Sequence, residues 1–194
     1  HDEMLDDGSL LSRTLNSKHE NVKYLPGARL PDNVVAETDL AKAAFQATLV
    51  IFAVPQQYLH TGMFAKVLAG CAPNCRVLSL VKGLSFRENL THDELGGTTV
   101  ALVPTLVSRQ MTDELHGLDV SVLMGANVAA EVGADQFCEA TLGVRSGEAG
   151  EAWYKLLNLP TFRLNVVMDV EGVEVCGGLK GLVALGAGFC DGLR

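Results

Sequence analysis

The sequence lacks an excess of basic residues and a paired cysteine motif, and each absence argues against a class of protein. Its 15 Lys and Arg stand against 23 Asp and Glu, for a formal net charge of -8, whereas nucleic-acid binding relies on clustered Lys and Arg. Of the five cysteines, Cys71 and Cys75 are separated by three residues and have no companion pair, a spacing that does not suit zinc. We therefore expect no nucleic-acid partner, no metal, and reduced thiols as in the cytoplasm.

The chain also lacks an apolar leader and a long uninterrupted apolar run. Its first ten residues are acidic and contain no apolar stretch, so they do not resemble a secretory signal. Residues 175–190 are apolar but shorter than the roughly 20 residues that a membrane span needs, and Lys180 interrupts them. We expect no membrane span and instead a helix buried inside a soluble protein. The predicted localisation is cytoplasmic, with an organelle as the alternative.

Short apolar runs of strand length recur along the chain. They lie at residues 33–36, 48–54, 76–81, 119–124, 139–144 and 162–167. Their continuous rather than alternating hydrophobicity indicates strands covered on both faces, as in a parallel sheet. Helix-like stretches between them lie at residues 39–46, 63–68, 106–115, 129–137 and 148–157. This alternation predicts βαβ units and a doubly wound α/β sheet.

Two segments depart from the alternation. Residues 84–117 are the least regular, and we expect an extended connection with one or two helices there. Residues 170–192 are rich in glycine among Val, Leu and Ala. Glycine weakens a helix by up to about 1 kcal/mol relative to Ala, which buried helices accept where a backbone or a ligand comes close. We interpret this segment as a long interdomain helix.

No Gly-rich turn of the kind that holds a dinucleotide pyrophosphate follows a first strand. The segment Gly186-Ala-Gly188-Phe-Cys-Asp-Gly192 has its third glycine one position late and no turn before a new helix, so helix packing explains it better. A βαβ unit takes roughly 30 residues, about what a dinucleotide-binding domain would need before residue 1. We therefore expect an α/β sheet that lacks its first βαβ unit.

Several segments, in order along the chain, resemble one family. They are His19-Glu-Asn-Val-Lys-Tyr-Leu-Pro-Gly27, Phe52-Ala-Val-Pro-Gln-Gln-Tyr58, Leu78-Ser-Leu-Val-Lys-Gly83, Val122-Leu-Met-Gly-Ala-Asn-Val-Ala129, Val173-Glu-Val-Cys-Gly-Gly-Leu-Lys180 and Gly186-Ala-Gly-Phe-Cys-Asp-Gly-Leu193. The chain is thereby similar to eukaryotic-type NAD-dependent glycerol-3-phosphate dehydrogenases, which carry Val-Pro-His-Gln-Phe, Ser-Leu-Ile-Lys-Gly and Val-Glu-Ile-Cys-Gly-Ala-Leu-Lys. The resemblance is weakest between residues 84 and 117.

The resemblance implies a Rossmann-type fold, NAD as cofactor, and reversible hydride transfer between NADH and dihydroxyacetone phosphate that gives sn-glycerol 3-phosphate. It also implies a homodimer in the full-length form. Residues 1–169 would be a partial NAD-binding domain, and residues 170–194 the start of a truncated helical substrate domain. Because the Gly-rich turn and the family's remaining substrate residues are absent, we expect these 194 residues alone to be inactive.

Four residues receive roles from the resemblance. Lys180, alone in an apolar helix where burial would lower a lysine's pKa, matches the family's general acid in reduction and base in oxidation. Lys82 ends a strand, where open α/β sheets place ligands, and matches a substrate-binding lysine. Tyr58 matches an aromatic residue beside the cofactor, and Ala129 begins a helix near the cofactor. The alternatives are solvated lysines and simple packing.

One position departs from the family, because Gly181 stands where the family has an Asn that helps to position the substrate. This departure keeps open a non-catalytic, truncated or degenerate paralogue that acts as a folded or oligomerising module. A sibling hydroxyacid dehydrogenase of the 6-phosphogluconate dehydrogenase-like group is a third alternative. The Val-Glu-Val-Cys and Gly-Phe-Cys-Asp-Gly segments argue against it.

Overall fold

The computed structural model describes residues 2–59, 61–92 and 98–193. Its centre is a five-stranded sheet with the order β3-β4-β7-β8-β9. These strands are Leu49–Phe52, Arg76–Ser79, Asp119–Gly125, Cys138–Gly143 and Phe162–Val167. The pairs β3–β4, β4–β7 and β8–β9 are parallel, and only β7–β8 among the pairs of this sheet is antiparallel. The predicted α/β fold with a mostly parallel sheet is therefore confirmed.

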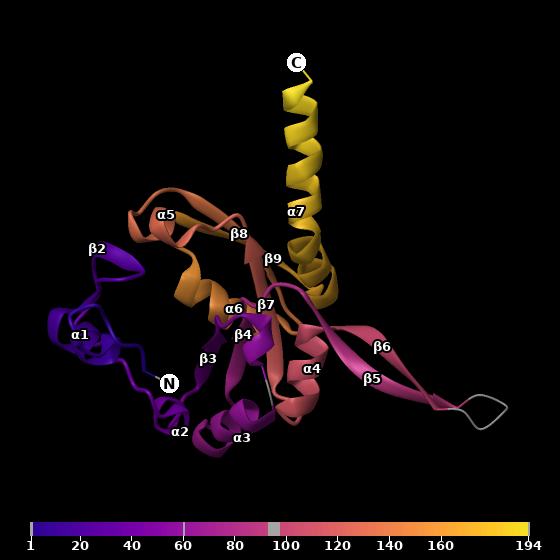
Figure 1. The fold of residues 1–194 in the computed structure, drawn as a ribbon, viewed down its shortest axis with the longest axis horizontal. Coiled ribbons are helices and arrows are strands. Elements are labelled where there is room, and N and C mark those ends of the chain that lie inside the picture. Colours follow the sequence, from indigo (N-terminus) through magenta and orange to yellow (C-terminus); the bar gives the residue numbers. More distant parts are fainter. Residues whose placement is uncertain (1, 60, 93–97, 194) are drawn as a thin grey trace.

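The helices follow the predicted stretches closely (Figure 1). They are α1 (Leu11–Lys18), α2 (Leu40–Ala43), α3 (Thr61–Gly70), α4 (Val107–Glu114), α5 (Ala129–Gly133), α6 (Gly147–Leu157) and α7 (Val170–Gly192). Three of the described helices begin at side-chain caps. The Asp39 carboxylate accepts from the Ala41 amide at 3.0 Å, the Ser146 hydroxyl from the Ala149 amide at 3.2 Å, and the Asp169 carboxylate from the Gly172 amide at 2.8 Å.

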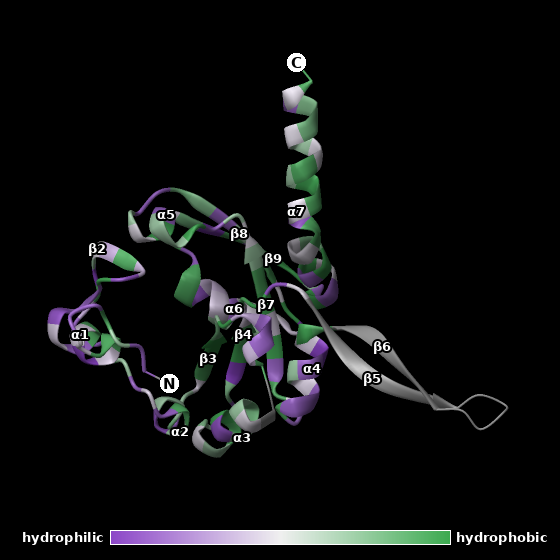
Figure 2. Ribbon diagram, viewed as in Figure 1, coloured by the Kyte–Doolittle hydropathy of each residue, from purple (hydrophilic) through white to green (hydrophobic). Residues whose placement is uncertain are grey.

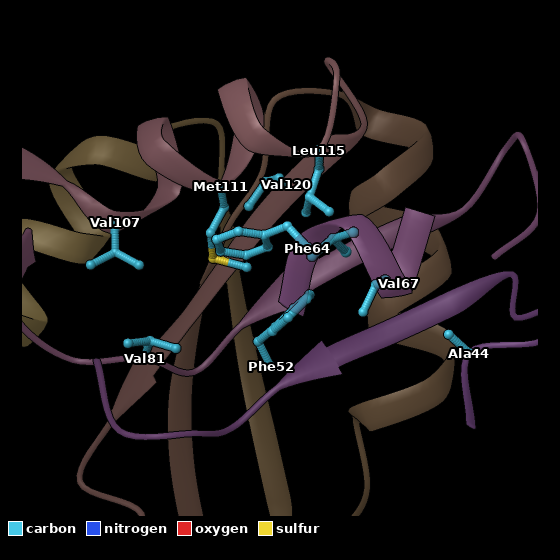
Figure 3. Close-up of a cluster of buried hydrophobic side chains, with 10 residues drawn as sticks. Ala44, Phe52, Phe64, Val67, Val81, Val107, Met111, Leu115 and Val120 are labelled. Atoms are coloured by element: carbon cyan, nitrogen blue, oxygen red, sulfur yellow. The ribbon is translucent and has the colours of Figure 1, made fainter. Parts of the chain in front are cut away.

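Two hydrophobic clusters lie on opposite faces of the sheet. Successive strand residues point to opposite faces, and Val77 belongs to one cluster whereas Leu78 belongs to the other. The first cluster contains Phe64 of α3 and Met111 of α4 (Figure 3). The second is built around Trp153 of α6. Helices thus cover both faces, which is the doubly wound arrangement that the sequence predicts.

Residues 84–117 are more regular than expected. They contain the strands β5 (Leu84–His92) and β6 (Thr98–Leu106), which pair antiparallel and extend away from the sheet, followed by α4 (Figure 1). Residues 93–97 lie outside the described part of the chain. The expectation of an irregular connection is wrong for the hairpin, because the two strands satisfy each other's backbone hydrogen bonds without joining the main sheet.

The predicted strand at residues 33–36 is also wrong, because this segment has no strand partner in the described chain. Its Val35 is 72% exposed. The Asn16 side chain instead binds the backbone of Ala36, donating to its carbonyl at 3.0 Å and accepting from its amide at 2.6 Å. Nearby, β1 (Glu20–Asn21) and β2 (Leu25–Arg29) form a short antiparallel pair that the sequence did not predict.

The long Gly-rich helix is confirmed as α7, but its predicted burial is wrong. Only its first turns pack against the sheet, and the rest projects from the body of the molecule (Figure 2). Leu182, Val183 and Phe189 are 66%, 72% and 70% exposed, because no described element covers them. By length and composition alone α7 could cross a membrane, although a single such helix is weak evidence for a span.

Candidate functional site

The carboxyl ends of three parallel strands gather most of the sequence-predicted site residues at one edge of the sheet. Tyr58 ends the short 3-10 helix Gln56–Tyr58 that follows β3, Lys82 comes three residues after β4, and Ala129 begins α5 after β7. Because β3, β4 and β7 are parallel neighbours, these ends meet at the same edge. Open α/β sheets bind ligands at this edge.

Lys180 reaches the same edge from α7. Its ammonium nitrogen Nζ donates to the backbone carbonyl of Gly125, the last residue of β7, at 3.1 Å. The helix comes this close because Gly177, one turn earlier, has no side chain. A Cβ there would lie 2.5 Å from Cγ of Met124. Gly177 is thus a position where close approach requires glycine.

The two lysines lie close enough to influence each other. Burial and the neighbouring ammonium of Lys180 lower the pKa of Lys82, in the direction expected for a cation that is partly desolvated beside another cation. Both lysine side chains are exposed, and for Lys180 this is contrary to the burial expected from its apolar surroundings in sequence. The exposure of Lys180 arises because the described chain leaves that side of α7 uncovered. Two adjacent ammonium groups suit an anionic ligand.

The loop after β3 contacts the loop after β4. Gly83 has a φ of +116°, and a Cβ there would lie 2.7 Å from Oε1 of Gln56. Any side chain at Gly83 would therefore be strained by the backbone conformation, and the end of the Gln56 side chain would have to move aside. This contact joins the turn that carries Tyr58 to the segment that carries Lys82. The Tyr58 side chain is 60% exposed at this edge.

Two cavities open near the edge. The first, of about 520 Å³, is mostly apolar and is lined by Ile51, Leu78, Asn127 and Ala129 among others. The buried Oδ1 of Asn127 has no hydrogen-bond partner among the described residues, which leaves an acceptor for a ligand donor. The second cavity, of about 530 Å³, is lined by Lys180 together with Gly125 and Gly177. Ala129 and Lys180 therefore face different cavities.

The sequence analysis missed Glu174, which is 2% exposed. Its carboxylate accepts from the Val107 amide at 2.6 Å and from the Ser108 amide at 3.2 Å, both at the start of α4. Burial raises the pKa of Glu174, and these hydrogen bonds oppose the rise. An acidic residue inside an apolar, Gly-rich helix was the available signal. Buried carboxylates need partners.

Gly181, where the sequence departs from the family pattern, lies in open space. A Cβ at this position would meet nothing within 4 Å. Neither a steric conflict nor a positive φ requires glycine there. The departure from Asn is therefore not forced by packing within the described chain.

Comparisons with known proteins identify the family of this chain. Residues 4–149 match the family described as NAD-dependent glycerol-3-phosphate dehydrogenase N-terminus. A glycerol-3-phosphate dehydrogenase 1-like protein of Danio rerio is 44% identical, with 100% of this chain and 51% of that protein covered. The human cytoplasmic glycerol-3-phosphate dehydrogenase [NAD(+)] is 42% identical over 96% of this chain and 49% of its own length.

Solved structures agree with the sequence relatives. A glycerol-3-phosphate dehydrogenase from Plasmodium falciparum superposes with a TM-score of 0.77 at 36% identity, covering 95% of this chain and 48% of that one. The enzyme from Saccharomyces cerevisiae gives 0.77 at 32% identity, covering 99% and 52%. The chain thus spans about half the length of the relatives it matches. It belongs to the NAD-dependent glycerol-3-phosphate dehydrogenase family, a family of Rossmann-fold oxidoreductases whose cofactor is NAD.

Proposed function

We propose that the full-length protein carrying this chain catalyses reversible hydride transfer between NADH and dihydroxyacetone phosphate, giving sn-glycerol 3-phosphate. The observation that supports this most directly is the convergence of Lys82 and Lys180 at the carboxyl edge of the parallel strands. Two adjacent ammonium groups at this edge suit a phosphorylated ketone, whose phosphate is anionic and whose carbonyl oxygen gains charge during reduction.

Lys180 is the proposed general acid of the reduction. A proton passes from its Nζ to the carbonyl oxygen of the ketone while hydride reaches the carbonyl carbon, and the reverse reaction returns that proton to Lys180. The hydrogen bond from Nζ to the Gly125 carbonyl holds the ammonium at the strand edge. Bound NADH supplies the hydride in reduction, and NAD accepts it in oxidation.

Lys82 is the proposed substrate-binding residue. Its lowered pKa reflects partial burial and the nearby Lys180, and an anion between the two lysines would relieve their repulsion. Tyr58 and Ala129 are the proposed cofactor contacts. The apolar cavity beside Ala129 and the unpartnered Oδ1 of Asn127 suit a flat, amide-bearing ring.

The test is a turnover assay on the full-length protein with dihydroxyacetone phosphate and NADH. Lys180→Met should lower kcat by about 100-fold, the ordinary contribution of a general acid. Lys82→Met should also raise KM for the ketone. If the wild type turns over the substrate and the Lys180→Met variant has the same kcat, Lys180 does not have the proposed role.

A second candidate is a non-catalytic paralogue that acts as a folded or oligomerising module. Gly181 favours it, because glycine provides no amide beside Lys180. A folded, full-length wild type without turnover on this substrate would support the second candidate.

We also propose that the full-length protein is a cytoplasmic homodimer. In it, residues 1–169 belong to the NAD-binding domain and residues 170–194 begin the substrate domain. Cell fractionation would test the localisation, and sedimentation would test the oligomeric state.

A further inference from the structure

We propose that Glu174 is a positioning residue whose carboxylate ties α7 to the start of α4 and so sets how Lys180 meets Lys82. The proposal rests on the function proposed above, since it concerns the same pair of lysines. Glu174 itself forms no hydrogen bond or ion pair with either lysine within the described residues; its carboxylate binds the amides of Val107 and Ser108. Its influence passes through α7, which carries Lys180, and through α4, which packs beside the backbone next to Lys82.

The contact between α7 and α4 is a helix cap supplied from a distant part of the chain. The residue before α4, Leu106, provides no side-chain cap, so the first amides of this helix need another acceptor. Glu174 provides it: Oε1 accepts from Val107 at 2.6 Å and from Ser108 at 3.2 Å, and Oε2 accepts from Ser108 at 3.2 Å. A carboxylate at a helix N-terminus is also favoured by the helix dipole.

On the α4 side, side-chain packing connects this cap to the backbone beside Lys82. Val107, which donates to Glu174, is fully buried in the same cluster as Val81 (Figure 3). Val81 directly precedes Lys82. A shift of α4 would therefore disturb the packing that fixes the backbone next to Lys82, because close-packed interiors transmit small displacements.

On the α7 side, Lys180 lies about two helical turns after Glu174. Gly177 follows Glu174 by about one turn and lies against Met124, and Lys180 follows by about another and binds the Gly125 carbonyl. The helix is thus anchored on α4 by Glu174 and on β7 by Gly177. The two anchors together decide how far Lys180 extends over the strand edge.

The same helix offers a matched control. Glu171, three residues before Glu174, is also acidic, but it forms surface ion pairs with Arg145 at 2.9 Å and Arg109 at 3.7 Å. Surface pairs contribute little to stability. Glu171→Gln therefore removes a charge from the same helix and weakens a surface pair with Arg109 of α4, but it leaves the cap of α4 in place.

The first experiment compares Glu174→Ala, Glu174→Gln and Glu171→Gln in the full-length protein. Glu174→Ala should lower kcat for dihydroxyacetone phosphate by roughly 100-fold, as expected when a catalytic group is displaced by about 1 Å, with KM for NADH unchanged. Glu174→Gln keeps one acceptor oxygen and should lose less. Glu171→Gln should match the wild type.

The second experiment measures the titration of Lys82 by NMR on ¹³C-methylated lysines, which needs no turnover. In both Glu174 variants the pKa of Lys82 should rise, because Lys180 moves away. The rise should be larger in Glu174→Ala than in Glu174→Gln. Unchanged kcat and an unchanged Lys82 titration in folded variants would overturn the proposal. If Glu174→Ala does not fold, Glu174→Gln decides by the same two readouts. If the wild type shows no turnover, the proposed function fails, and the Lys82 titration alone still decides the role of Glu174.

Discussion

The central strands of the sheet and the projecting part of α7 are both largely apolar, but they lie in opposite environments (Figure 2). In the body, Phe64 and Trp153 are fully buried between helices and strands, whereas on α7 Phe189 is 70% exposed. Hydropathy of a segment thus indicates what it could bury, and only the neighbouring elements decide what it does bury. Lys180 lies at the boundary between these two regions.

The largest expected effect is a difference in unfolding free energy between matched Phe→Ala variants in the two regions. Phe64→Ala should lower the free energy of unfolding by about 3–5 kcal/mol, because it leaves a cavity in the first cluster. The matched change Phe189→Ala should shift it by less than about 0.5 kcal/mol, as at other exposed positions. Chemical denaturation of this chain measures both. Equal losses would mean that the far half of α7 is packed in solution.

A second prediction tests whether an Asn side chain at position 181, on the exposed part of α7, improves the candidate site. In the full-length protein, Gly181→Asn should raise kcat/KM for dihydroxyacetone phosphate by at least about tenfold. A hydrogen bond to a charged group contributes roughly 1.5–3 kcal/mol, and the space around Gly181 is open. A flat or lower kcat/KM would show that the site has adapted to glycine. Gly181→Ala, which adds no amide, is the control.

A third prediction compares two glycines of α7 on either side of the boundary. Gly177→Ala should destabilise this chain by about 1–3 kcal/mol, because its Cβ would press on the buried Met124. Gly181→Ala should instead stabilise the helix by up to about 1 kcal/mol. Thermal unfolding of both variants measures the contrast. Stabilisation by both changes would place α7 farther from β7 than described.

The smallest expected effect concerns the coupling of the two lysines. Lys180→Met removes the ammonium that, with burial, lowers the pKa of Lys82, so the pKa of Lys82 should rise. In the wild type, stability should increase with pH between the lowered folded pKa and the ordinary value of 10.5, because there the unfolded chain binds more protons. That increase should weaken in Lys180→Met. NMR titration of methylated lysines checks the shift.

The sequence predicts the sheet well and the projecting elements poorly. Strands such as β7 (Asp119–Gly125) match the predicted run, because strands buried on both faces carry mostly apolar residues. The antiparallel direction of β8 and the β5–β6 hairpin could not be read from hydrophobicity, which carries no strand direction. The strand expected at residues 33–36 failed because a strand also needs a partner.

The candidate site shows the same limit. Strand-end placement and the family segments point to Lys82, Tyr58 and Ala129, and the structure has all three after parallel strands. Glu174 escaped because its partner amides lie 66 and 67 residues away in the chain. The pairing of Lys82 with Lys180 also depends on contacts that no local pattern contains.

The edge strand β3 has a consequence for how this chain is handled. Within the described residues it pairs on one side only, with β4, and its Ile51 is 45% exposed. An open apolar strand edge is a template for pairing with another chain. Protein concentration therefore becomes a variable in every unfolding measurement, since association of copies through β3 would raise the apparent stability by mass action.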